Sequence, residues 1–320
     1  MYTITDGANL SSLEQAKVNY VDFETAVTRF FKDYLRESAF LRRHPSFFLQ
    51  YRLMRPFFRK LFPFMYLRKG STVVQVGCAE WMLDFGVSMP LIMSAIVGPR
   101  GRVVVVEPDQ KNVDSLTAYI SHHGIRNITI VKKAAWKEKC VRDFTFYEDN
   151  TGSNIVSETE EAAPWKHMEM YQNRPKRTEK IQMDTIDNIC AELGVTPAFV
   201  DLTINGAEFE VIQGMPRTLQ SGATIAWLFG DRWWWREAFD FMKERGFDIT
   251  VAASAYSHRV RSKDGRPQVN SHREFAAFQD VMHAVAVPKN AHMKGDRGIP
   301  VTLYKHKDFS FSFKPLRPEE

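Results

Sequence analysis

The stretches STVVQVG, at residues 71–77, and RVVVVEPD, at residues 102–109, decide the fold of this chain. Each is a short run of β-branched residues that ends in a turn, which is the pattern of a buried strand. The residues between the two runs have helical character, and strands that alternate with helices form parallel sheets with right-handed crossovers. The two runs therefore predict the first two strands of a doubly wound α/β domain.

Further strand patterns follow along the chain. They are ITIVKKAAW (128–136), AFVDLTI (198–204), ATIAWLF (223–229), FDITVAAS (247–254), and either DVMHAVAV (280–287) or PVTLYK (300–305). These runs predict a seven-stranded, mostly parallel sheet with helices on both faces. The polar residues 148–180 interrupt the alternation, and a connection of that length in a compact domain is typical of a lid or substrate loop.

The chain divides into three parts on this pattern. Residues 1–69 are expected to form a helical N-terminal extension, because apolar groups recur there at helical spacing. Residues 70–287 form the α/β domain, and residues 288–320 an irregular tail. Within the extension, residues 42–69 interleave aromatic residues with Arg and Lys. That pattern fits peripheral contact with a membrane, or a cover for the sheet whose basic ends reach water. Prolines interrupt any long surface helix and favour the cover.

Composition sets the class of protein. The chain has 320 residues, of which 44% are hydrophobic and 25% charged, as in soluble globular proteins. Its net charge of +5 favours an anionic partner without identifying one. Cys78, Cys140 and Cys190 form no CxxC pair, so we expect neither a zinc site nor a disulfide framework. With no signal-peptide pattern and no long apolar run, the sequence predicts a cytoplasmic protein, with membrane association as the alternative for residues 42–69.

Ligands of open parallel sheets bind beyond the carboxyl ends of the strands, where the strand order reverses. Gly77 lets the chain turn closely beside a ligand, and the carboxylate of Glu107 can accept hydrogen bonds from both hydroxyls of a ribose. Because no GxGxxG pattern accompanies them, a pyrophosphate-bearing dinucleotide is disfavoured. The residues expected to hold a ribose-bearing cofactor after these two strands are Gln75, Gly77, Cys78, Ala79, Glu80, Glu107 and Pro108.

The sequence resembles the FkbM family of methyltransferases over about residues 71–250. The matching pieces, in order, are VVQVG, VGPRGRVVVVEPDQKNVDSL, NITIVKKAAW, IQMDTIDNI and FVDLTINGAEFEVIQGM. The resemblance implies a Rossmann-like domain of the class I methyltransferase type and S-adenosylmethionine as cofactor. It also implies that Glu107 holds the ribose, that the Gly77 loop holds the methionine portion, and that Ala134 to Trp136, including Ala135, lie near the adenine. The implied activity is methylation of an oxygen on a sugar, glycan or related small molecule.

Three positions depart from the family pattern. Gln75 stands where an Asp is commoner, and Thr203 and Asn205 replace acidic residues, which leaves Glu208 as the matching carboxylate of that motif. A non-catalytic protein that binds S-adenosylmethionine is therefore one alternative. A nicotinamide-dependent sugar oxidoreductase is a second alternative, which the missing YxxxK pair disfavours. Nucleic acid is not an expected partner, because the sheet domain has no basic stripe with interleaved aromatics.

Methylation of a hydroxyl benefits from a base that takes its proton. Glu208, Asp231 and His167 are the candidates at the expected edge of the sheet, and each has a structural alternative, such as support of a helix start for Glu208. Trp233, Trp234 and Trp235 follow the fifth strand, where core packing or ligand stacking are both open. The residues expected to contact the acceptor are Ser153, Asn154, Thr203 and Asn205.

Overall fold

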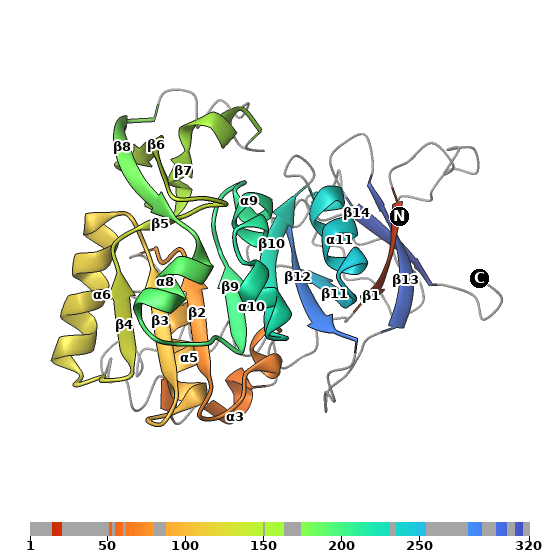
Figure 1. The fold of residues 1–320 in the computed structure, drawn as a ribbon, viewed down its shortest axis with the longest axis horizontal. Helices are drawn as coiled ribbons and strands as arrows, with labels where there is room; N and C mark the ends of the chain where they lie inside the picture. Colours follow the sequence, from red (N-terminus) through yellow and green to blue (C-terminus); the bar gives the residue numbers. More distant parts are fainter. Residues whose placement is uncertain are drawn as a thin grey trace, which may run out of the picture.

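The computed structural model describes eleven stretches of the chain. They are residues 15–20, 51–52, 55–59, 62–79, 88–149, 151–162, 174–230, 235–253, 281–289, 299–305 and 311–315. A ten-stranded main sheet and a four-stranded second sheet make up the strands of these stretches (Figure 1).

Seven neighbouring strands of the main sheet confirm the predicted fold class. Their spatial order is β4-β3-β2-β9-β10-β12-β11, in which β12 alone runs antiparallel to its neighbours. The order reverses between β2 and β9, which places the switch point of a doubly wound sheet there. This is the strand order of the class I methyltransferase fold. The bounds are β2 (Thr72–Val76), β3 (Arg102–Val106), β4 (Ile128–Val131), β9 (Phe199–Leu202), β10 (Thr224–Gly230), β11 (Phe247–Ala253) and β12 (Val281–Pro288).

Helices cover both faces of these strands, because successive side chains of a strand point to opposite faces. Val73 and Val105 pack with one group of helices, and Val74 and Val106 with the other. The first group is α3 (Arg55–Phe58), η3 (Phe64–Tyr66), α5 (Met89–Val97) and α6 (Gln110–His122). The second is α8 (Ile186–Glu192), α9 (Glu208–Gln213), α10 (Pro216–Gln220) and α11 (Trp235–Glu244).

Three further strands extend the main sheet beyond β11. They are β1 (Gln15–Tyr20), β13 (Ile299–Lys305) and β14 (Phe311–Pro315). The prediction of helix is therefore wrong at residues 15–20, and the prediction of an irregular tail is wrong at β13 and β14. The reason is pairing across the chain: β1 lies parallel to β11 and antiparallel to β13, and such tertiary pairing overrides local spacing.

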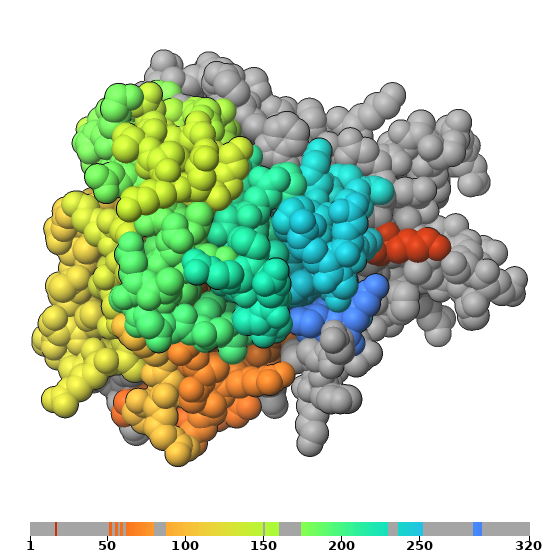
Figure 2. Space-filling model, in the orientation of Figure 1, coloured from red at the N-terminus to blue at the C-terminus, as the bar shows by residue number. Residues whose placement is uncertain are grey.

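The second sheet begins before the stretch that the sequence predicts as a loop and takes in parts of it. Its strands, in the order β5-β8-β6-β7, are β5 (Ala134–Ala135), β6 (Cys140–Tyr147), β7 (Ile155–Val156) and β8 (Lys176–Asp184). Two 3-10 turns, η4 (Thr151–Ser153) and η5 (Ser157–Ala162), flank β7. The prediction of a loop over residues 148–180 is therefore wrong at β7 and at residues 176–180 of β8. Figure 2 shows the second sheet, in yellow-green, as a raised lobe at the upper left of this face.

The described aromatic residues between Tyr51 and Tyr66 cover the sheet. Tyr51, Phe58 and Phe64 are buried in the same core cluster as α5. Their rings are therefore not available to a membrane, as expected if this segment is a cover. Within the described residues, no helix is long and apolar enough to span a bilayer.

Candidate functional site

The loops that follow β2 and β9 meet at the switch point. Gly77 follows β2 with a φ of +84°, and a Cβ there would lie 2.3 Å from the carbonyl oxygen of Thr203. Both the left-handed backbone and the close approach exclude any residue with a side chain. Gly77 thus brings the two loops into direct backbone contact.

Gln75 and Thr203 connect the two strands beneath this contact. The Nε2 of Gln75, a residue with 0% exposure, donates to the carbonyl oxygen of Gly77 at 3.1 Å and to the hydroxyl of Thr203 at 3.1 Å. That hydroxyl donates in turn to Asp201 at 3.1 Å. Gln75 therefore connects β2 to the loop after β9 by donating hydrogen bonds, and an ionised Asp at this position could not donate. Among the described residues its Oε1 has no hydrogen-bond partner, an uncommon state for a buried acceptor.

Glu107 lies directly after β3 and links the next pair of loops. Its Oε2 accepts from the backbone N–H of Cys78 at 2.7 Å, and its Oε1 accepts from the N–H of Asp109 at 2.9 Å. Burial raises the pKa of Glu107 to about 7, although both N–H groups and the side chain of Asn112 act in the opposite direction. Each carboxylate oxygen has a second lone pair. Glu107 can therefore accept further hydrogen bonds from a ligand while it holds its own loops.

The other expected cofactor residues are placed as follows. Cys78 and Ala79 are buried beside Glu107, and Pro108 is half-buried; Glu80 lies outside the described residues. Burial and the neighbouring Glu107 raise the pKa of the Cys78 thiol, so this cysteine is neutral and unsuited to nucleophilic chemistry.

Ala135 and Trp136 are also buried. The Trp136 side chain packs with Phe144 and Phe146 of the second sheet, and its Nε1 has no hydrogen-bond partner among the described residues. The close contact between Gly214 and the backbone of Trp136 fixes this segment against the end of α9. Contact of Ala134 to Trp136 with an adenine stays a prediction.

Glu208 is the first residue of α9, and its side chain is only 4% exposed. Burial, followed by the neighbouring charge of Glu210, raises its pKa well above the ordinary value, whereas backbone N–H groups at the helix start lower it. Its Oε1 has no hydrogen-bond partner in the described part of the chain. The carboxyl group therefore supports the helix start and also retains an oxygen that could take a proton. Asp231, His167, Trp233 and Trp234 lie outside the described residues, as does the side chain of Trp235.

The expected acceptor residues are brought together, but their polar groups contact the protein itself. The side-chain amide of Asn205 donates to the carbonyl oxygens of Gly152 and Asn154, at 3.0 and 2.8 Å. Asn154 donates to Asp109 at 2.6 Å, and the hydroxyl of Ser153 accepts from Arg174 at 3.1 Å. The η4 turn of the second sheet is thereby fixed between the loop after β9 and the loop after β3.

Asp201 and Glu210 were not among the site residues expected from the sequence. Asp201 lies within β9 and is 0% exposed. An acidic residue inside an apolar strand is unusual, and this feature of the sequence could have identified it as a candidate. Burial raises the pKa of Glu210, and its Oε2 has no partner among the described residues. Among those residues, no ion pair neutralises Glu107, Asp109 or Glu208. The carboxyl end of the main sheet thus gathers several carboxyl groups, of which Glu107 and Glu208 hold their protons more strongly than usual because they are buried.

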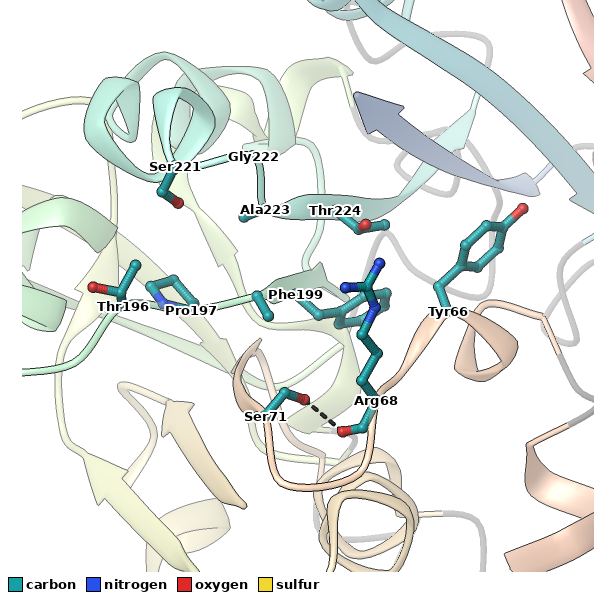
Figure 3. Close-up of a pocket in the computed structure, with 11 residues that line it drawn as sticks. Tyr66, Arg68, Ser71, Thr196, Pro197, Phe199, Ser221, Gly222, Ala223 and Thr224 are labelled. Atoms are coloured by element: carbon teal, nitrogen blue, oxygen red, sulfur yellow. Dashed lines mark hydrogen bonds between the residues drawn. The ribbon is translucent and has the colours of Figure 1, made fainter. Parts of the chain in front are cut away.

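A cavity of about 250 Å³ lies at the opposite end of the main sheet (Figure 3). Ser71 donates to the carbonyl oxygen of Arg68 at 2.7 Å, and no carboxylate is among its lining residues. Its position at the amino ends of the strands is not where doubly wound sheets bind their ligands. The lining residues are Tyr66, Arg68, Ser71, Thr196, Pro197, Ala198, Phe199, Ser221, Gly222, Ala223 and Thr224.

Comparison with models of protein families finds no match to this chain. Comparison with curated protein sequences finds none either.

Comparison with solved structures finds methyltransferases of low sequence identity. One is the methyltransferase FkbM from Methylobacillus flagellatus, 13% identical, with a TM-score of 0.40 over 71% of this chain and 47% of that one. A second is an S-adenosylmethionine-dependent O-methyltransferase from Thermotoga maritima, 12% identical, with a TM-score of 0.38 over 73% and 68%. A third is fibrillarin from Aeropyrum pernix, in complex with S-adenosyl-L-methionine, 12% identical, with a TM-score of 0.35 over 73% and 74%. This chain thus spans about half the length of the Methylobacillus protein, and the fold assignment rests on the strand order described above.

Proposed function

We propose that this chain is an S-adenosylmethionine-dependent methyltransferase of the FkbM type. The observation that carries the proposal is Glu107, a buried carboxyl group at the end of the second strand of the seven-stranded unit, held to the loop after the first strand through Cys78. A carboxylate in this place is suited to the two hydroxyls of a ribose.

The charge of the site supports a cationic cofactor over a dinucleotide. Asp109 carries no ion pair within the described residues, and Glu107, with a pKa raised to about 7, adds negative charge as the pH rises through neutrality, so a bound pyrophosphate would meet uncompensated negative charge. A sulfonium group is attracted by the same field. When bound, S-adenosylmethionine supplies the reactive methyl group, and the protein's part is to hold the acceptor in line with it.

The acceptor is proposed to be a hydroxyl of a sugar, glycan or related small molecule. Glu208 is the proposed group to take the hydroxyl proton, because it lies buried at the carboxyl end of the sheet, burial raises its pKa, and its Oε1 has no hydrogen-bond partner among the described residues. Asp231 and His167 remain the proposed alternatives for this base. Residues 70–287 form the proposed catalytic domain.

Thermal-shift measurements with S-adenosylmethionine, S-adenosylhomocysteine, NAD and NADP test the cofactor. A ligand that binds the folded state raises the melting temperature, and we expect the first two alone to do so. Calorimetry on Glu107→Ala should show S-adenosylhomocysteine binding weakened by roughly 1 to 3 kcal/mol, the cost of removing a charged acceptor. The control is Arg68→Ala, in the cavity at the other end of the sheet. An unchanged Kd in folded Glu107→Ala would contradict the proposal.

A non-catalytic protein that binds S-adenosylmethionine is the second candidate. Thr203 and Asn205 favour it, since both stand where acids are expected and both contact the protein itself. Formation of S-adenosylhomocysteine with a panel of hydroxylated acceptors separates the two. Tight binding without transfer to any acceptor would favour the non-catalytic protein.

A further inference from the structure

A continuous path of hydrogen bonds joins the acceptor side of the site to Glu107. It begins at Asn205, in the loop after β9, whose amide holds the carbonyl oxygens of Gly152 and Asn154. It continues through the Asn154 side chain to the Oδ2 of Asp109 at 2.6 Å. The backbone N–H of Asp109 then donates to Glu107 at 2.9 Å. Loops that are separate in the sequence are thus connected by a turn of the second sheet.

Asn154 uses both ends of its amide in this path. Its Oδ1 accepts from the N–H of Tyr147 at the end of β6, at 2.9 Å, while its Nδ2 donates to Asp109. The other oxygen of Asp109 caps α6 by accepting from the N–H of Lys111 at 3.0 Å. An amide facing a carboxylate satisfies this arrangement, because the Nδ2 donates to Asp109 while the Oδ1 of Asn154 and the other oxygen of Asp109 each accept from a backbone N–H, whereas two carboxylates would repel.

We propose that Asn154 and Asn205 are positioning residues, which fix the second sheet over the carboxyl end of the main sheet and couple its placement to the loop that carries Glu107. This inference rests on the proposed cofactor site at Glu107. It explains the departure from the family pattern at Asn205. A carboxylate at that position would face two carbonyl oxygens, whereas an amide donates to both. The acid is absent there because the position serves docking of the second sheet.

Exchanging the two partners tests the path directly. Asn154→Asp places a carboxylate against Asp109, and the double variant Asn154→Asp with Asp109→Asn restores one donor and one acceptor. Asn is also a good helix cap, so the double variant keeps the cap of α6. Asn188→Asp is the comparison: its amide also donates to a carboxylate, the buried Asp184, at 3.0 Å, but it lies outside the path from Asn205 to Glu107.

The readouts are the Kd for S-adenosylhomocysteine, by calorimetry, and amide hydrogen exchange over residues 140–156. We expect Asn154→Asp to weaken binding by about tenfold or more and to speed exchange there. The double variant should return both close to the unaltered protein, and Asn188→Asp should change neither. Equal behaviour of Asn154→Asp and Asn188→Asp, or a folded double variant without recovery, would overturn the proposal.

Failure of the cofactor assignment gives a different result. If the unaltered protein does not bind S-adenosylhomocysteine, the proposed function fails. Exchange that is fast in Asn154→Asp and normal in the double variant would then still support the positioning role. Asn205→Asp should also speed exchange over residues 151–156 more than Asn205→Ala. The alanine only removes the two hydrogen bonds to the carbonyl oxygens, whereas the carboxylate also repels those oxygens. The opposite order would contradict the explanation given for Asn205.

Discussion

At the carboxyl end of the main sheet the polar side chains are buried, whereas at the amino end they line an open cavity. Gln75, Glu107 and Glu208 are each at most 4% exposed, and Gln75 and Glu208 each keep an oxygen without a partner among the described residues. At the amino end, the hydroxyls of Ser71 and Ser221 donate to carbonyl oxygens three residues earlier. There the polar groups stabilise turns.

This difference between the two ends of the main sheet indicates which end holds the functional site. A buried polar group without a hydrogen-bond partner lowers stability. Where such groups gather at one end of a sheet, a functional role for them is therefore expected. The cavity at the amino end has volume, yet no carboxylate lines it. Cavity volume alone would favour a site at the amino end, whereas the buried polar side chains favour a site at the carboxyl end.

The largest expected effect concerns turnover at the carboxyl end. If Glu208 is the base, Glu208→Gln should lower the rate of methyl transfer by about 10² to 10⁴ and leave the Kd for S-adenosylhomocysteine nearly unchanged, since the group acts on the acceptor. The rate of S-adenosylhomocysteine formation measures it. Glu244→Gln, on the exposed end of α11, is the control. Full turnover in Glu208→Gln would move the base to Asp231 or His167.

The next effect compares two glycines with nearly the same backbone φ angle. Gly77→Ala should destabilise the fold by about 3 kcal/mol or more, because it adds a clash with Thr203 to the left-handed strain. Gly70 has a φ of +82° with nothing within 4 Å of a Cβ, so Gly70→Ala should cost about 1 to 2 kcal/mol. Urea denaturation measures both. Equal losses would mean that the loops after β2 and β9 can separate at little cost.

A smaller effect is the pH dependence of cofactor binding. The pKa of Glu107 is raised to about 7, so its carboxylate form, which accepts ribose hydroxyls, becomes populated as the pH rises through neutrality. The affinity for S-adenosylhomocysteine should therefore increase by up to about tenfold between about pH 6 and about pH 8. Calorimetry across this range tests it, with Glu107→Gln expected to give a flatter profile. A profile that is equally steep in both proteins would assign the titration to another group.

The smallest effect is a gain in stability. The pKa of Glu208 is higher in the folded chain than in the unfolded chain, so the unfolded chain releases this proton first as the pH rises. Glu208 therefore destabilises the folded state increasingly above about pH 4.5. Glu208→Gln should raise stability by roughly 0.5 to 2 kcal/mol near neutral pH, and the gain should vanish in acid. Melting temperatures at both pH values, compared with Glu244→Gln, decide it. A loss of stability near neutrality would show that the carboxyl group is well accommodated.

Six strands of the seven-stranded unit were predictable because each is a short apolar run, whereas the sequence left the seventh open between residues 280–287 and 300–305. The position of Glu107 after the second run also followed from the sequence, since the rule for parallel sheets selects strand ends. The second sheet was not predictable in the same way. Residues 176–180 of β8 are all exposed, and β5 and β7 have only two residues each, so no apolar period marks them.

The contacts of the candidate site were less predictable than its residues. Asn154 and Asn205 were identified as members of the site from the family resemblance. Their partners lie 45 and 51 residues away, at Asp109 and at the carbonyl of Asn154 itself, and no local pattern encodes such pairs. The role of these side chains in the site stays a prediction, whereas their contacts with the protein required the three-dimensional structure.

The position of β1 also constrains how the chain reaches its folded state. Residues 15–20 are made more than 200 residues before their partners, β11 at residues 247–253 and β13 at residues 299–305. Domains fold during synthesis largely from the N-terminal side, and contacts between distant segments form slowly. β1 must therefore wait until residues 247–253 and 299–305 have been made before it can form these pairs. Chaperone demand during synthesis is the expected consequence, and it should fall at this strand more than at β2 and β3, which are neighbours both in sequence and in space.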